Sequence, residues 1–68
     1  MKYEVIIYWS DADNVFVAEV PDLPGCMTHG STYEEAARNV QEAMAGWLKS
    51  WADLGRPVPQ PRQRALSA

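Results

Sequence analysis

Cys26 and His29 are the residues whose side chains could ligate a metal ion, and they lie three positions apart. This spacing is half the pattern of a zinc site, which needs four ligands. Residues three apart on a strand point to opposite faces, and the whole chain has one cysteine and one histidine. We therefore predict no metal and no cofactor. Cys26 is expected to pack as a small apolar group, and His29 to lie at the surface or in an interface.

Three aspartates could form the acidic cluster of a metal-dependent nuclease: Asp11, Asp13 and Asp22. The first two lie in a predicted hairpin loop and the third in a proline-flanked turn. Aspartate is favoured in such places because its side chain caps local backbone groups. No serine has a partner base nearby, and the sequence has no glycine-rich phosphate loop. The turn interpretation is therefore favoured, and we predict that the protein is not an enzyme.

The elements that position these residues begin with two strands, at residues 2–9 and 14–20, joined by a polar hairpin connection. A short third strand is predicted at residues 26–29. Neither of the first two strands has a purely polar face, which is typical of a sheet that a helix covers on one side and another molecule covers in part on the other. The residues expected on one face are Tyr3, Val5, Ile7 and Trp9 in the first strand and Phe16, Ala18 and Val20 in the second.

One long amphipathic helix is predicted from about Tyr33 to Leu54. Thr32 and Glu35 have the spacing of a capping box at its start, and Gly55 is suited to end it. Alanines dominate the first half of its apolar stripe and tryptophans the second, so the helix should approach the sheet closely at one end and stand off at the other. The stripe comprises Tyr33, Ala36, Ala37, Val40, Ala43, Met44, Trp47, Leu48, Trp51 and Leu54.

Two proline-rich segments connect or follow these elements: one lies between the second and third strands, and the other follows the helix. Residues 20–26 turn the chain sharply, because proline lacks an N–H and glycine accepts a positive φ. Alternating prolines in residues 57–61 forbid a helix and favour an extended path, such as one along a sheet edge. We predict an α+β fold, a two-layer β-β-β-α(-β) domain with an antiparallel sheet packed on one long helix. The domain is expected at residues 1–61 and a flexible tail at residues 62–68.

Composition limits the partners and the compartment. The 68 residues carry a net charge of −3, with six Lys+Arg against nine Asp+Glu, and show no basic patch for direct nucleic-acid binding. The apolar run near the start is too short for a secretory signal or a membrane span, and a single cysteine forms no internal disulfide. We therefore expect a cytoplasmic protein with no membrane association.

Self-association is also expected, because a chain of this size with 47% hydrophobic residues and three tryptophans has little room for a core. We predict a homodimer or homotetramer. Packing of the two helical tryptophans on the sheet is an alternative of equal weight to an interface. The oligomer-interface candidates are Ile6, Tyr8, Val17, Trp47 and Trp51.

Four sequence elements occur in order: a hairpin of the form Tyr-x-Val-x-Ile, then residues 16–26 with Pro21-Asp22-Leu23-Pro24-Gly25-Cys26, then residues 30–36, then residues 55–61. Together they resemble the HicB-like antitoxin family over about residues 3–61. The resemblance implies a three-stranded antiparallel sheet with one packed helix and a further extended segment, described as a partial ribonuclease H-like fold. Longer family members add a DNA-binding module, which this short form lacks, so direct DNA binding is not expected.

The resemblance further implies a partner, a small basic HicA-type toxin that cleaves mRNA and whose active histidine the antitoxin occludes. An acidic, aromatic surface on loops and edges is expected to cover it. The toxin-binding candidates are Trp9, Asp11, Asp13, Asp22, Leu23, Pro57, Val58 and Pro59. Two alternatives stay open: an orphan HicB-like oligomeric binding or regulatory module without a cognate toxin, and, least favoured, an RNA-processing enzyme.

Overall fold

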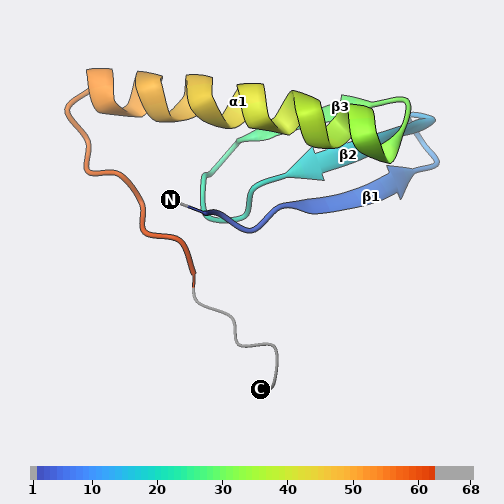
Figure 1. Ribbon diagram of the computed structural model, residues 1–68, viewed down its shortest axis with the longest axis horizontal. Coiled ribbons are helices and arrows are strands. Elements are labelled where there is room, and N and C mark those ends of the chain that lie inside the picture. The colour runs from blue at the N-terminus through green and yellow to red at the C-terminus, as the bar shows by residue number, and fades with distance from the viewer. Residues whose placement is uncertain (1, 63–68) are drawn as a thin grey trace.

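The protein is described by a computed structural model of residues 2–62. Three strands precede one helix: β1 (Ile6–Ser10), β2 (Val15–Glu19), β3 (Met27–Gly30) and α1 (Tyr33–Asp53). The strands form one antiparallel sheet in the order β1-β2-β3, and α1 lies across one face of it (Figure 1). The predicted α+β, two-layer β-β-β-α arrangement is confirmed.

β1 starts four residues later than predicted, because β2 has no partners to offer the earlier residues. Ile6 pairs with Glu19 at the end of the ladder. One residue further along, the N–H of Val20 donates to the carbonyl of Cys26 at 3.0 Å, and Pro21 has no N–H. The ladder therefore ends where the turn of residues 20–26 begins.

The core lies between the sheet and α1, and it is small. Its buried residues are Tyr3, Ala18, Val20, Leu23, Cys26, Ala36 and Val40. The predicted inward faces of the first two strands are largely confirmed, with Ile7 and Phe16 packed against this cluster. Trp9 is the exception, since 43% of it is exposed beyond the end of the core.

α1 begins and ends as the sequence predicts. The Thr32 hydroxyl accepts a hydrogen bond from the N–H of Glu35 at 3.0 Å. The carboxylate of Glu35 accepts in return from the N–H of Ser31 at 2.8 Å, one residue before the position expected in a capping box. At the other end Gly55 has φ 73°, and its N–H donates to the carbonyl of Ala52, as in a Schellman motif.

The first half of α1 packs tightly on β3. A Cβ on Gly30 would lie 2.5 Å from the backbone nitrogen of Ala36, so only glycine fits between strand and helix. The second half of α1 extends past the strands (Figure 1). This agrees with the prediction that the helix stands off from the sheet at its tryptophan-containing end. The predicted apolar stripe is too long at both ends, however, because Tyr33 is 57% exposed and Leu54 is 66% exposed.

After the helix, residues 57–62 form an extended segment, here called the C-terminal segment, which leads away from the end of α1 and passes the start of the chain near Tyr3 (Figure 1). They form no strand in the described part of the chain, so the optional last strand of the predicted fold is absent there. Prolines at every second position explain this, since they remove the N–H groups on one side of an extended chain. Arg62, predicted to start the flexible tail, is bound to Asp22; residues 63–68 lie outside the described residues.

Candidate functional site

The hairpin loop between β1 and β2 holds two of the predicted acidic contacts in fixed positions. Asp11 accepts a hydrogen bond from the indole N–H of Trp9 at 2.8 Å. Asp13 accepts from the hydroxyl of Ser10 at 3.1 Å, and Asn14 closes the loop with φ 56° while its N–H donates to the carbonyl of Ser10. Both aspartates are exposed, so the loop presents two carboxylates to solvent. The predicted turn-stabilising role of these residues agrees with these bonds.

The turn of residues 20–26 differs from the prediction. Asp22 is engaged within the molecule, because Arg62 donates to it from its backbone N–H at 3.0 Å and from its guanidinium Nε at 2.6 Å. These bonds from Arg62 lower the pKa of the Asp22 carboxyl and raise that of the Arg62 guanidinium. Only 9% of the Asp22 side chain is exposed, so it offers little surface to a partner.

Leu23 was predicted to contact a partner, but its side chain does not lie at the surface of this chain. Its side chain is fully buried, with 0% of its surface exposed, and it is one of the two largest side chains at the centre of the core. The N–H of Leu23 donates to the carbonyl of Val20, and its own carbonyl accepts from Cys26. The turn therefore folds inward and places Leu23 beneath α1 instead of at the surface.

The backbone of the C-terminal segment is held by aromatic side chains. The indole N–H of Trp51 donates to the carbonyl of Pro57 at 2.8 Å, and the hydroxyl of Tyr3 donates to the carbonyl of Pro59. Val58 stays exposed between these two anchors. Two of the three predicted contact residues in this segment thus use their carbonyl groups internally, and the Val58 side chain remains available.

Trp47 and Trp51, predicted for either the sheet or an interface, stack on each other at 4.6 Å between ring centroids. Trp47 donates its indole N–H to the carbonyl of Pro24 at 2.9 Å, and the Arg56 guanidinium lies 4.7 Å over the Trp51 ring. Both rings are half-buried. They connect α1 to the turn and to the C-terminal segment, and their part in an oligomer stays a prediction.

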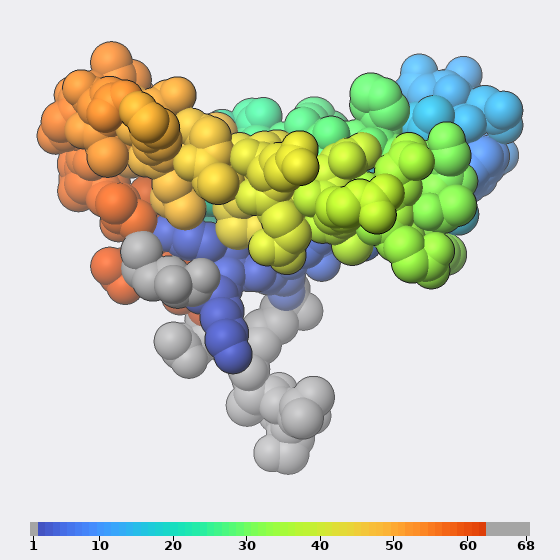
Figure 2. All heavy atoms as spheres, turned by 45° about the horizontal axis from the view of Figure 1, so that its top comes forward, coloured from blue at the N-terminus to red at the C-terminus, as the bar shows by residue number. Residues whose placement is uncertain are grey.

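The predicted toxin-binding residues do not form one surface. Trp9, Asp11 and Asp13 lie at the hairpin end of the sheet, beside the start of α1, whereas the turn and the C-terminal segment lie toward the other end of the helix (Figures 1 and 2). The hydrogen bonds between Asp22 and Arg62 and between Trp47 and Pro24 hold the second group together. The structure therefore offers two separate groups of candidate contacts.

A further surface is the face of the sheet opposite α1, here called the outer face. The strand register places Tyr8, Val17 and His29 in one row across it and Ile6, Glu19 and Met27 in the next. Three of the predicted oligomer-interface residues, Ile6, Tyr8 and Val17, lie here. Met27, which was not among the predicted interface residues, is 54% exposed on the same face. The alternation of β3, which puts Met27 and His29 on one side, was the signal that could have found it.

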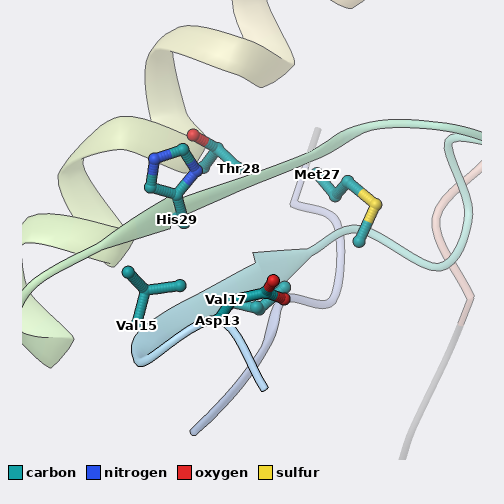
Figure 3. Close-up of a pocket in the computed structure, with 6 residues that line it drawn as sticks. All are labelled: Asp13, Val15, Val17, Met27, Thr28 and His29. Carbon is teal, nitrogen blue, oxygen red and sulfur yellow. The ribbon is translucent and has the colours of Figure 1, made fainter. Parts of the chain in front are cut away.

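A hollow of about 410 Å³ opens on the outer face between β2 and β3 (Figure 3). Val15, Val17 and Met27 give it an apolar surface, and His29 and Asp13 add polar groups. The hollow extends from the outer face to the hairpin loop, so Asp13 of the loop also lines it.

Cys26 is buried in the core, as predicted, and burial raises the pKa of its thiol. Among residues 2–62, no three side chains of the His, Cys, Asp and Glu types gather in a way that could hold a metal ion. Within the same residues, α1 is not long and apolar enough to cross a membrane.

The sequence of this chain is similar to a known family model and to other proteins. The sequence model of the HicB-like antitoxin of bacterial toxin–antitoxin systems matches residues 3–66. A UPF0150 protein of Thermoplasma acidophilum is 42% identical over 60 residues, which cover 88% of this chain and 86% of that protein.

Solved structures show the same fold. The N-terminal domain of the Burkholderia pseudomallei antitoxin HicB superposes with a TM-score of 0.77 at 28% identity, over 94% of this chain and 74% of that one. A chain in a HicA3–HicB3 toxin–antitoxin complex superposes with a TM-score of 0.76 at 28% identity, over 94% of this chain and 72% of that one.

Proposed function

Because this chain belongs to the HicB-like antitoxin family of bacterial toxin–antitoxin systems, we propose that it binds and occludes a small basic HicA-type toxin that cleaves mRNA. The observation that carries the proposal is the fold match to a chain of a HicA3–HicB3 complex, which extends over 94% of this chain. In this proposal the protein acts as a non-enzymatic regulator, and its effect comes from covering a surface of the toxin.

The charge of the chain supports such a partner. A net charge of −3 repels RNA and attracts a basic protein, and the exposed acids of the hairpin loop add to this at one end of the sheet. A ribonuclease that binds RNA needs a basic surface, which an acidic cover fits. The proposed mechanism is exclusion: the antitoxin occupies the surface on which the mRNA lies.

The test is inhibition of the toxin encoded beside this chain. We expect the two proteins to co-purify, and the purified antitoxin to stop cleavage of an mRNA substrate at an equimolar ratio. Raising the salt concentration should weaken the complex, because opposite charges steer and hold it. Full toxin activity in the presence of a folded excess of this protein would overturn the proposal.

The second candidate is an orphan HicB-like module that oligomerises and has no cognate toxin. Its supporting observation is the apolar outer face, which a second copy of the chain can cover. The same experiment separates the two candidates. A chain that self-associates in sedimentation and has neither a basic neighbour nor an inhibited ribonuclease fits the orphan module.

A further inference from the structure

The outer face of the sheet is apolar in its centre, and its strands carry no lysine or arginine. Ile6, Tyr8 and Met27 are exposed on it, and the helix lies on the opposite face. The three strands and the loop of residues 11–14 contain no lysine or arginine, although the whole chain has six. The acids Asp11, Asp13 and Glu19 occur in these same elements. The face is therefore apolar with an acidic border.

In the hollow between β2 and β3, apolar side chains lie next to an acidic one. Val15 and Val17 line it from β2, and Met27 and His29 line it from β3 (Figure 3). Asp13 reaches it from the hairpin loop. One oxygen of the Asp13 carboxylate accepts from Ser10, and the other accepts no hydrogen bond from the part of the chain that the structure describes. An anchored carboxylate with a free oxygen thus stands beside an apolar depression.

This combination matches a long cationic side chain. Lysine and arginine lay their aliphatic stems along apolar surface while the charged head reaches an acid. Val15 and Val17 can pack against the stem, and Asp13 can accept from the head. The exposed ring of His29 adds a flat surface on which a guanidinium group can stack. A volume of about 410 Å³ is ample for one such side chain.

Charge also distinguishes between the possible occupants. A second copy of the chain placed on this face would add its own Asp13 and Glu19 to those of the first, without a lysine or arginine from the strands to balance them. A basic protein meets the acids with opposite charge. We propose that the hollow receives an arginine or lysine side chain of a basic partner protein. This inference rests on the proposed function, and it assigns Val17 to that contact instead of to an oligomer interface.

The experiment uses the folded full chain and a defined probe, the peptide acetyl-Leu-Arg-Leu-amide, titrated while backbone amide shifts are followed by NMR. We expect saturable shifts at residues 13, 15, 17 and 27–29, with a dissociation constant in the millimolar range. The analogue with citrulline in place of arginine keeps the shape and lacks the charge, so it should bind more weakly. Asp13→Asn should weaken the arginine probe about twofold to fivefold, the range of an exposed ion pair.

Asp11→Asn is the matched control. It removes the same charge from the same loop, but Asp11 is bonded to Trp9 and does not line the hollow. Binding of the probe should therefore change less than with Asp13→Asn. Equal effects of the two substitutions, equal binding of the citrulline peptide, or shifts centred on α1 would each overturn the inference.

Two further outcomes are informative. If the amides of the outer face shift with the concentration of the protein itself, and the probe leaves them unchanged, a second copy covers the face and the inference is wrong. A chain that inhibits its toxin but does not bind the probe in the hollow contradicts this inference alone. Conversely, a chain that binds the probe and leaves the toxin active contradicts the proposed function.

Discussion

Asp22 and Arg62, forty positions apart in the chain, form the closest ion pair of the described residues. Bonds from Arg62 lower the pKa of the Asp22 carboxyl relative to the unfolded chain. A carboxyl with a lowered pKa contributes stability above the pKa of the unfolded state, near pH ~4, and loses it as the pH falls through the folded value. The attachment of the C-terminal segment should therefore weaken in acid.

We predict that Asp22→Asn lowers the melting temperature at pH 7, and that the difference from the wild type shrinks as the pH falls below about 4. Thermal denaturation followed by circular dichroism from pH 7 to pH 3 measures both effects. Asp53→Asn is the control, since the Lys49–Asp53 pair is exposed on both sides and should contribute little at any pH. A pH-independent difference for Asp22→Asn would contradict the prediction.

Two glycines provide a matched pair of substitutions. A methyl group on Gly30 meets the backbone of Ala36 at 2.5 Å, so Gly30→Ala should destabilise the protein by about 1–3 kcal/mol, the cost of overpacking. Gly46 lies within α1 with nothing within 4 Å of the added carbon, so Gly46→Ala should stabilise by about 0.5–1 kcal/mol. Urea denaturation of both variants gives the two values. A stabilising effect of Gly30→Ala would contradict the close packing of β3 on α1.

At the residue scale, the amino-acid types predicted the surroundings of some side chains and missed those of others. Cys26 is buried, as its apolar character suggests, and Asp11 and Asp13 stabilise their loop through local bonds that short-range patterns can reveal. The burial of Leu23 and the ion pair of Asp22 were not foreseen, because their partners come from elsewhere in the chain. A turn with two prolines indicates a surface position, and nothing in its own sequence shows that α1 will cover its leucine.

At the scale of elements, the start of α1 depends on a side-chain cap. Thr32→Ala removes the hydroxyl that accepts from Glu35, and we expect a loss of about 0.5–2 kcal/mol in unfolding free energy, measured by urea denaturation. Thr32→Ser keeps the acceptor and should restore most of the stability. If the serine variant were as unstable as the alanine variant, the methyl group of Thr32 and not its hydroxyl would be responsible.

The helix was the element that the sequence predicted most fully. Its cap, its closing glycine and its change from alanine to tryptophan all appear in the structure. The first strand was predicted too long, because its sequence continues to alternate through residues 3–5 while its pairing partner has already turned at Val20 and Pro21. A strand's sequence does not show where the neighbouring strand stops.

At the scale of the whole molecule, the second half of α1 is tied to the C-terminal segment through Trp51 and to the turn of residues 20–26 through Trp47. Trp51→Phe keeps the stacked pair of rings and removes the hydrogen bond to the carbonyl of Pro57. We expect a loss of about 0.5–1.5 kcal/mol, together with faster exchange of the bonded amides of Gly55 and Arg56, measured by hydrogen exchange. Trp47→Phe is the comparison, since its bond goes to Pro24 and its loss should loosen the turn. Identical exchange patterns in the two variants would contradict this division.

The arrangement of the candidate contacts at two ends of the domain could not be predicted from sequence. The sequence placed Asp22 and Asp13 in similar polar turns, but the fold sets one under Arg62 and leaves the other beside the hollow of the outer face. Loop residues give no signal of which strands will flank them. The outer face itself was foreseen through Ile6, Tyr8 and Val17, since strand alternation alone determines it.

β1 lies at one margin of the sheet, with strand pairing on one side among the described residues. The run Val5-Ile6-Ile7-Tyr8-Trp9 contains no charge and no proline, and such runs on an open margin can stack into fibrils. Charged residues bracket it at Glu4 and Asp11, in the manner of gatekeepers. The margin formed by β1 is thus also a hazard in concentrated solution, where loss of the bracketing acids should favour amyloid.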